Sequence, residues 1–216
     1  MWIDVTYPVN DKLLIYPGDP PYERTVCSSM EKGDYCNVSQ ISLGCHTGTH
    51  VDAPLHFVPG GAGVDFIDLD RINGPVRVIG YDILGDSPQD IGLEFLKSCH
   101  IHPGERLLFK TSNGRRFKGK TLLKDYAAID LEAAKYLVRM EVKCIGIDYL
   151  TIEPAGSGDG GVHKTILGAG IPVIETLSLE AVTPGRYEMM CLPLRLSDAE
   201  ASPVRALLKS TGAAKG

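Results

Sequence analysis

The stretch of sequence that decides the fold is residues 45–56, which read CHTGTHVDAPLH. Its three histidines and its aspartate all occupy even positions: His46, His50, Asp52 and His56. On an extended segment these side chains would project from one side, because successive side chains of a strand alternate. On a helix only the first two histidines would share a face, and Pro54 would resist a helix there. The spacing therefore predicts an extended or irregular segment on which imidazole and carboxylate groups converge.

Imidazole nitrogen and carboxylate oxygen together are typical ligands of zinc, manganese and iron(II). Gly48 leaves no side chain between the first two histidines, so the backbone could approach an ion closely. Another carboxylate, Glu175, lies within the apolar residues 171–177, where burial without a partner would be costly. A metal ion removes this cost; the alternative is an edge strand on which Glu175 faces water or a lysine. The sequence thus predicts one or two zinc ions per chain, with manganese as an alternative.

Short apolar runs separated by Gly, Pro and Asp predict more strands than helices. Strands are expected at residues 2–7, 13–16, 36–43, 75–81, 106–110, 144–148, 171–177 and 186–196. Asp90 is expected to cap a short helix over residues 91–97, and Asp130 a clearer helix over residues 131–140. A third short helix is expected over residues 162–167. Without an internal repeat or linker, residues 1–210 are predicted to form one α/β domain, followed by a frayed tail at residues 211–216.

The composition is that of an ordinary globular protein, with 44% hydrophobic and 23% charged residues and a net charge of −5. No nucleic-acid partner is expected, and the densest basic run, residues 110–124, is interpreted as a solvated loop. No apolar run is long enough to span a membrane, and no signal peptide is visible. We therefore expect a cytoplasmic protein whose six cysteines stay reduced.

The central motif resembles the signature of the metal-dependent cyclase family, which includes bacterial kynurenine formamidase and isatin hydrolase. The resemblance extends to residues 16–20 (YPGDP), 146–149 (GIDY), 153–154 (EP) and 192–196 (LPLRL), with His163 and Glu175 in the family's order. It implies a swivelling β/β/α fold with a mixed sheet, a few flanking helices and a two-metal site. The ligands it implies are His46, His50, Asp52, His163 and Glu175.

The same resemblance implies that Asp52 reaches both ions and that His56 accepts and donates protons. Spacing alone leaves a ligand role open for His56. Two positions depart from kynurenine formamidases: Tyr16 stands where Trp is usual, and Tyr149 lies in Asp-Tyr-Leu where Asp-Thr-Pro is usual. The family contacts its substrate at both positions, so Tyr16 and Tyr149 are the expected substrate contacts.

The expected activity is hydrolysis of a small amide, with N-formylkynurenine as the leading substrate and a cyclic amide such as isatin as the alternative. A non-catalytic metal-binding or sensor protein is the alternative from another class. A serine hydrolase is disfavoured because the sequence lacks a Gly-x-Ser-x-Gly elbow. The resemblance, together with the N-terminal aromatic residues, predicts a homodimer or higher homo-oligomer; alternatively, those rings fill the core of one chain.

Overall fold

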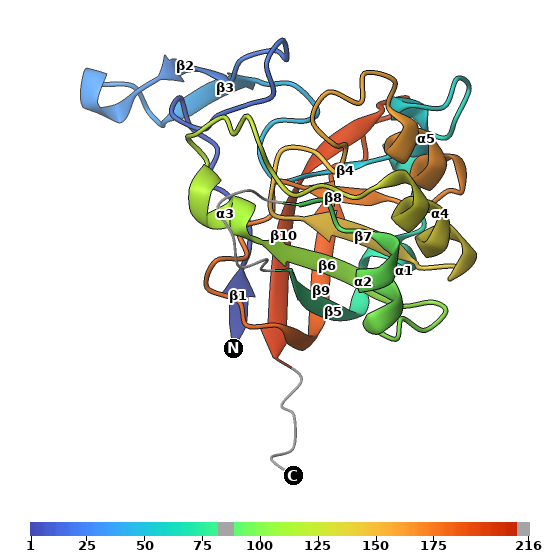
Figure 1. Ribbon diagram of the computed structural model, residues 1–216. Coiled ribbons are helices and arrows are strands. Elements are labelled where there is room, and N and C mark those ends of the chain that lie inside the picture. Colours follow the sequence, from blue (N-terminus) through green and yellow to red (C-terminus); the bar gives the residue numbers. More distant parts are fainter. Residues whose placement is uncertain (82–88, 211–216) are drawn as a thin grey trace.

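The computed structural model describes residues 1–81 and 89–210. Its main sheet follows the order β1-β10-β4-β8-β7-β6-β5-β9, and β9 also pairs with β10. These pairings close all of its strands except β1 into a ring (Figure 1). The strands of this sheet are β1 (Trp2–Asp4), β4 (His50–Asp52), β5 (Gly74–Tyr81), β6 (Arg106–Thr111), β7 (Cys144–Ile147), β8 (Val173–Glu175), β9 (Gly185–Pro193) and β10 (Ala201–Ser210).

Parallel and antiparallel pairs divide the ring. The strands β5, β6, β7 and β8 are parallel neighbours, whereas β4, β9 and β10 pair antiparallel with their neighbours. Parallel neighbours need crossover connections, and the chain supplies helices for them. The helices are α1 (Leu69–Ile72), α2 (Leu93–Ser98), α3 (Ser112–Phe117), α4 (Leu131–Arg139) and α5 (Gly161–Gly168). This mixed sheet with a few helices confirms the predicted α/β fold class.

Side-chain alternation along the strands creates two apolar layers. In β6, Leu108 packs into a core with residues of β4, β9 and β10 inside the ring. Its neighbours Leu107 and Phe109 pack instead with residues of α2, α4 and α5 outside the ring. These three helices cover one side of the barrel in Figure 1. A side chain on the outer face of β4 or β8 therefore points toward the helical layer.

A separate two-stranded sheet projects from the body at the other side of Figure 1. It consists of β2 (Glu23–Ser28) and β3 (Val38–Ser42), connected through the 3-10 helix η1 (Met30–Lys32). Nearly all of its strand residues are exposed. Two further 3-10 helices, η2 (Pro54–His56) and η3 (Val64–Phe66), follow β4.

Several predicted elements are confirmed with shorter bounds, and Asp130 caps α4 as predicted, since its Oδ1 accepts a hydrogen bond from Ala133 N at 2.6 Å. The strand predicted at residues 13–16 is wrong. The prediction for Asp90 is also wrong: α2 begins after Gly92, and the Asp90 carboxylate accepts a hydrogen bond from Ala128 N. The basic run is not simply a loop, because Thr111 caps α3 within it.

The strands β2 and β10 were not predicted. In β10, Pro203 and several helix-favouring residues weaken the strand pattern, and pairing with neighbours on both sides overrides it. The frayed tail predicted at residues 211–216 lies outside the described residues. Among the helices of the described part, none is long and apolar enough to cross a membrane.

Candidate metal centre

The central motif lies where β4 pairs with β8. The register places His50 opposite Glu175 and Asp52 opposite Val173. Val51 packs into the core inside the ring, so alternation turns His50 and Asp52 to the outer face, where α5 brings His163. The edge-strand alternative for Glu175 is wrong, because β8 lies between β4 and β7.

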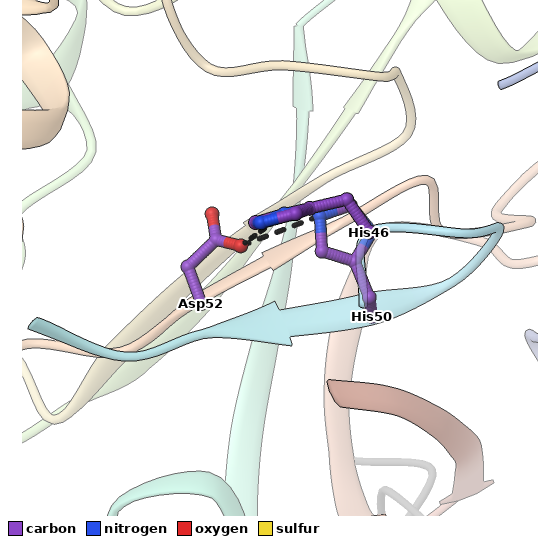
Figure 2. Close-up of side chains that lie close together, drawn as sticks. All are labelled: His46, His50 and Asp52. Atoms are coloured by element: carbon purple, nitrogen blue, oxygen red, sulfur yellow. Dashed lines mark ion pairs between the residues drawn. The ribbon is translucent and has the colours of Figure 1, made fainter. Parts of the chain in front are cut away.

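Three residues of the motif form a first group, His46, His50 and Asp52 (Figure 2). His46 Nδ1 lies 3.0 Å from Asp52 Oδ1, and His50 Nε2 lies 3.3 Å from the same oxygen. The two rings approach edge to face with centroids 4.9 Å apart. Figure 2 shows both rings directed at the carboxylate. This group can offer two imidazole nitrogens and one carboxylate to one ion.

A second group shares Asp52 and adds His163 and Glu175. His163 Nε2 lies 3.2 Å from Glu175 Oε1 and 4.0 Å from Asp52 Oδ2. All three residues are buried. Each Asp52 oxygen therefore faces a different group, which is the arrangement expected of a carboxylate that bridges two ions.

Unsatisfied atoms test whether these residues suit a metal. His50 Nε2 and both Asp52 oxygens are buried and make no hydrogen bond. Buried polar atoms rarely lack a partner, and a cation would satisfy all three. His50 Nδ1 lies 2.8 Å from the carbonyl oxygen of Gly48, which favours a proton on Nδ1 and leaves the Nε2 lone pair facing the cluster. The donor set therefore fits a divalent ion.

Charges in the cluster point the same way. Burial opposes ionisation, yet the neighbouring Asp52 and Glu175 carboxylates raise the pKa of His50 to about 10. Burial likewise opposes the charged form of His163, but Glu153 and Glu175 raise its pKa to about 10. The Asp52, Glu153 and Glu175 carboxylates thus favour positive charge at the cluster, which a divalent cation supplies.

His56 lies beside both groups but belongs to neither of those found in the described residues. Its ring centroid is 4.1 Å from that of His46 and 5.9 Å from that of His163. Burial lowers the pKa of His56, and the positive charges of the other two histidines act in the same direction, against Asp52. A half-buried histidine that is neutral near pH 7 suits proton transfer.

The motif converges by a different route from simple alternation. Only His50–Asp52 is a strand, while His46 lies in a turn before it and His56 lies in η2. Gly48 has a φ of +69°, and a Cβ there would lie 3.0 Å from Leu13 Cδ2. Gly48 therefore permits the turn between His46 and His50. The turn alone accounts for a glycine at this position, without a close approach of the backbone to an ion.

The histidines of the site and Glu175 line a cavity of about 510 Å³, a size typical of small-molecule sites. Tyr16, one of the two predicted substrate contacts, lines this cavity and is exposed. Tyr149 is 1% exposed and does not line it; its hydroxyl hydrogen-bonds to the backbone of Leu123. The ring of Tyr126, which does line the cavity, packs against Tyr149. Tyr149 thus supports the cavity wall from behind.

Three residues near the site escaped sequence reasoning, Tyr126, Lys164 and Glu200, whereas Glu153 was noted only as part of the Glu-Pro pair in the family resemblance. Glu153 and Lys164 flank the start of α5, and a carboxylate near a helix N-terminus is a recognisable signal. Glu200 Oε1 lies 3.6 Å from His46 Nε2, and Tyr126 faces the cavity from a loop. Tertiary packing alone places those two, so no local pattern indicated them.

Comparison with known proteins agrees with this geometry. The model of the Cyclase family ("Putative cyclase") matches residues 3–154. A kynurenine formamidase from Geobacillus thermodenitrificans is 38% identical over 212 residues, which cover 98% of this chain and 98% of that relative. The solved structure of a predicted metal-dependent hydrolase from Bacillus stearothermophilus is 35% identical, with a TM-score of 0.82 over 96% of this chain and 97% of that one.

A more distant structure shares the fold. Isatin hydrolase A from Labrenzia aggregata superimposes with a TM-score of 0.83 at 20% identity, over 96% of this chain and 93% of that chain. The family model covers more than half of the sequence, and the formamidase relative matches nearly all of it. The chain therefore belongs to the cyclase family.

Proposed function

We propose that this chain is a metal-dependent hydrolase of small amides, with an arylformamide such as N-formylkynurenine as its leading substrate. One observation carries the proposal: two ligand groups share the buried Asp52, and their other four residues line a cavity large enough for such a molecule. The full-length likeness to kynurenine formamidases supports the arylformamide. Cleavage would release formate and an aromatic amine.

The metal centre would consist of His46, His50, Asp52, His163 and Glu175, with zinc as the proposed ion and manganese as the alternative. A divalent ion supplies Lewis-acid activation of water and of a carbonyl group. The protein supplies the fixed geometry. Because both Asp52 oxygens face ligand histidines, Asp52 sets the separation of the two groups.

His56 would move the proton. Its lowered pKa keeps the ring neutral, so it can accept a proton from the attacking water. The same ring can then donate this proton to the leaving amine nitrogen, whose departure as an anion would be unfavourable. Phe57 stacks on the ring of His163, with the two ring centroids 4.5 Å apart, and so covers one face of that imidazole.

The cavity wall suits an aryl substrate. Tyr16 and Tyr126 offer aromatic rings, and both line the same cavity as His56. An aryl group packs favourably against such rings. Lys164 also lines the cavity and could face the carboxylate that N-formylkynurenine carries.

A substrate panel tests the activity. N-formylkynurenine, formanilide, isatin, a simple lactam and an aryl ester should be assayed with the zinc-loaded and manganese-loaded protein. We expect N-formylkynurenine to be turned over fastest. Activity confined to isatin would move the assignment to cyclic amides, and no activity with full metal content would support a metal-binding or sensor protein instead.

We also infer that the protein is a homo-oligomer, with a homodimer as the simplest form. A two-stranded sheet without packing on either face is marginally stable. The strands β2 and β3 expose Val26, Val38 and Ile41, which a second copy could cover. Light scattering should give a mass of at least twice 23.4 kDa, and a 23.4 kDa particle would contradict the inference.

A further inference from the structure

Glu153 holds His163 from the side opposite the metal centre. Its Oε2 lies 2.9 Å from His163 Nδ1 and accepts a hydrogen bond from His163 N at 3.1 Å. Its Oε1 accepts a hydrogen bond from Val162 N at 3.2 Å. One carboxylate thus fixes both the first turn of α5 and the imidazole that this turn carries. On the imidazole ring, the half-buried Glu153 contacts Nδ1, which leaves Nε2 to the cluster.

The adjacent residue holds the other ligand of the same group. Ile152 N donates a hydrogen bond to Glu175 Oε1 at 2.7 Å. Two successive residues, Ile152 and Glu153, therefore orient the two ligands that join Asp52 in the second group. In the first group the contacts are weaker: the Nδ1 of His50 meets a neutral carbonyl oxygen, that of Gly48, at 2.8 Å, and Glu200 Oε1 lies 3.6 Å from His46 Nε2, beyond hydrogen-bond distance.

A carboxylate at Nδ1 has a definite chemical effect. It favours the tautomer with a proton on Nδ1, so the Nε2 lone pair is free to bind a cation. It also makes the imidazole a stronger donor than a carbonyl partner does, and loss of such a partner typically weakens metal binding by roughly 10–100-fold.

We propose that Glu153 is a positioning residue for the second ion: its carboxylate fixes the tautomer and orientation of His163, and so sets the affinity of the Asp52–His163–Glu175 group. The inference rests on the proposed metal centre. Its test uses metal ions without substrate, so it can fail while the hydrolase proposal holds, and the reverse.

The test is a metal titration of the metal-free protein and of Glu153→Gln. In the variant an amide NH₂ replaces one carboxylate oxygen and can donate to Nδ1, which favours the tautomer that blocks Nε2. Calorimetry with Zn²⁺ and visible absorption with Co²⁺ should show two binding events in the wild type. We expect roughly 10–100-fold weaker binding of the second ion in Glu153→Gln, with binding of the first ion retained.

Asp159→Asn is the matched control. Asp159 Oδ1 accepts a hydrogen bond from Gly161 N at 3.1 Å, so this carboxylate also lies at the start of α5 and in the cavity wall. Within the described part of the chain, Asp159 makes no hydrogen bond or ion pair with a ligand histidine or with Glu175, and its backbone oxygen accepts a hydrogen bond from Lys164 Nζ. Because its side chain is exposed, the control should retain second-ion affinity within about fivefold.

Two results would overturn the inference: wild-type affinity for both ions in Glu153→Gln, or an equal loss in Asp159→Asn. Long-range proton–nitrogen NMR of the zinc-loaded protein adds a direct measurement, and it should find the His163 proton on Nδ1. If Glu153→Gln does not fold, Glu153→Asp takes its place, since it keeps the charge but shortens the reach. A selective loss of the second ion there supports the inference, and unchanged affinity overturns it.

Discussion

The two ligand groups that share Asp52 are assembled in different ways. The first, His46, His50 and Asp52, comes from one short segment around β4. The second joins Asp52 to Glu175 on β8 and His163 on α5, far along the chain. His46 is partly exposed to the cavity, whereas every member of the second group is buried. A local turn thus produces one group, and the whole sheet produces the other.

This difference predicts different sensitivities. The first group depends on the turn at Gly48, whose φ is positive, and on the short strand that follows. The second depends on the register between β4 and β8 and on how α5 packs over them. Asp52 belongs to both groups, so a substitution there should disrupt both of them at once.

The largest expected effect is therefore that of Asp52→Asn. The amide keeps the shape but is a poor ligand, so both ions should be lost, and turnover should fall by more than the roughly 10²–10⁴-fold typical of one acid–base group. His46→Ala and His163→Ala, each confined to one group, should retain about one equivalent of metal. Elemental analysis of the purified variants measures this, and full metal content in Asp52→Asn would disprove the bridging role.

The same comparison explains how much of the site the sequence could predict. His46, His50, Asp52 and His56 could be picked out because they share one side of an alternating pattern within eleven residues, although a turn and a 3-10 helix bring them together in the structure. Glu175 stood out because a carboxylate inside an apolar run needs a partner. Only the family resemblance pointed to His163, since its helix carries no local sign of facing a strand.

What spacing could not supply was tertiary contact. Tyr149 looked like a substrate contact by its position, but the structure buries it behind Tyr126. The strand β10, which pairs with β4 and closes the ring, was missed because its pairing on both sides outweighs a weak strand pattern. The fold class followed from short strands and few helices, whereas closure into a ring depends on register that no segment encodes alone.

The next effect concerns His56, which lies closer to the first group than to the second. His56→Ala should retain both ions, because neither group includes His56, and should lose turnover by roughly 10²–10⁴-fold. Metal content and kcat measured on the same preparation separate the two roles. A metal-free variant would show that His56 is a ligand, and would extend the first group to four residues.

The smallest effect concerns the scaffold behind the second group, where Tyr149 O accepts a hydrogen bond from Thr176 N beside Glu175. The preceding Asp148 is buried, which raises its pKa to about 7, and Thr111 Oγ1 donates to it at 2.6 Å. Since the pKa of Asp148 in the folded protein exceeds the usual 3.8, folding binds a proton between those two pH values, and the contribution of Asp148 to stability falls as pH rises through that window.

The substitution Thr111→Val removes a hydrogen-bond donor to the charged Asp148 carboxylate, so it should lower the free energy of unfolding by roughly 1.5–3 kcal/mol at pH 8.5 and by less at pH 5. The substitution also removes the cap on α3, which lowers the free energy of unfolding by the same amount at both pH values. The difference between the costs measured by urea unfolding at the two pH values therefore reports the hydrogen bond to Asp148. An equal cost at both would show that Asp148 stays in one protonation state.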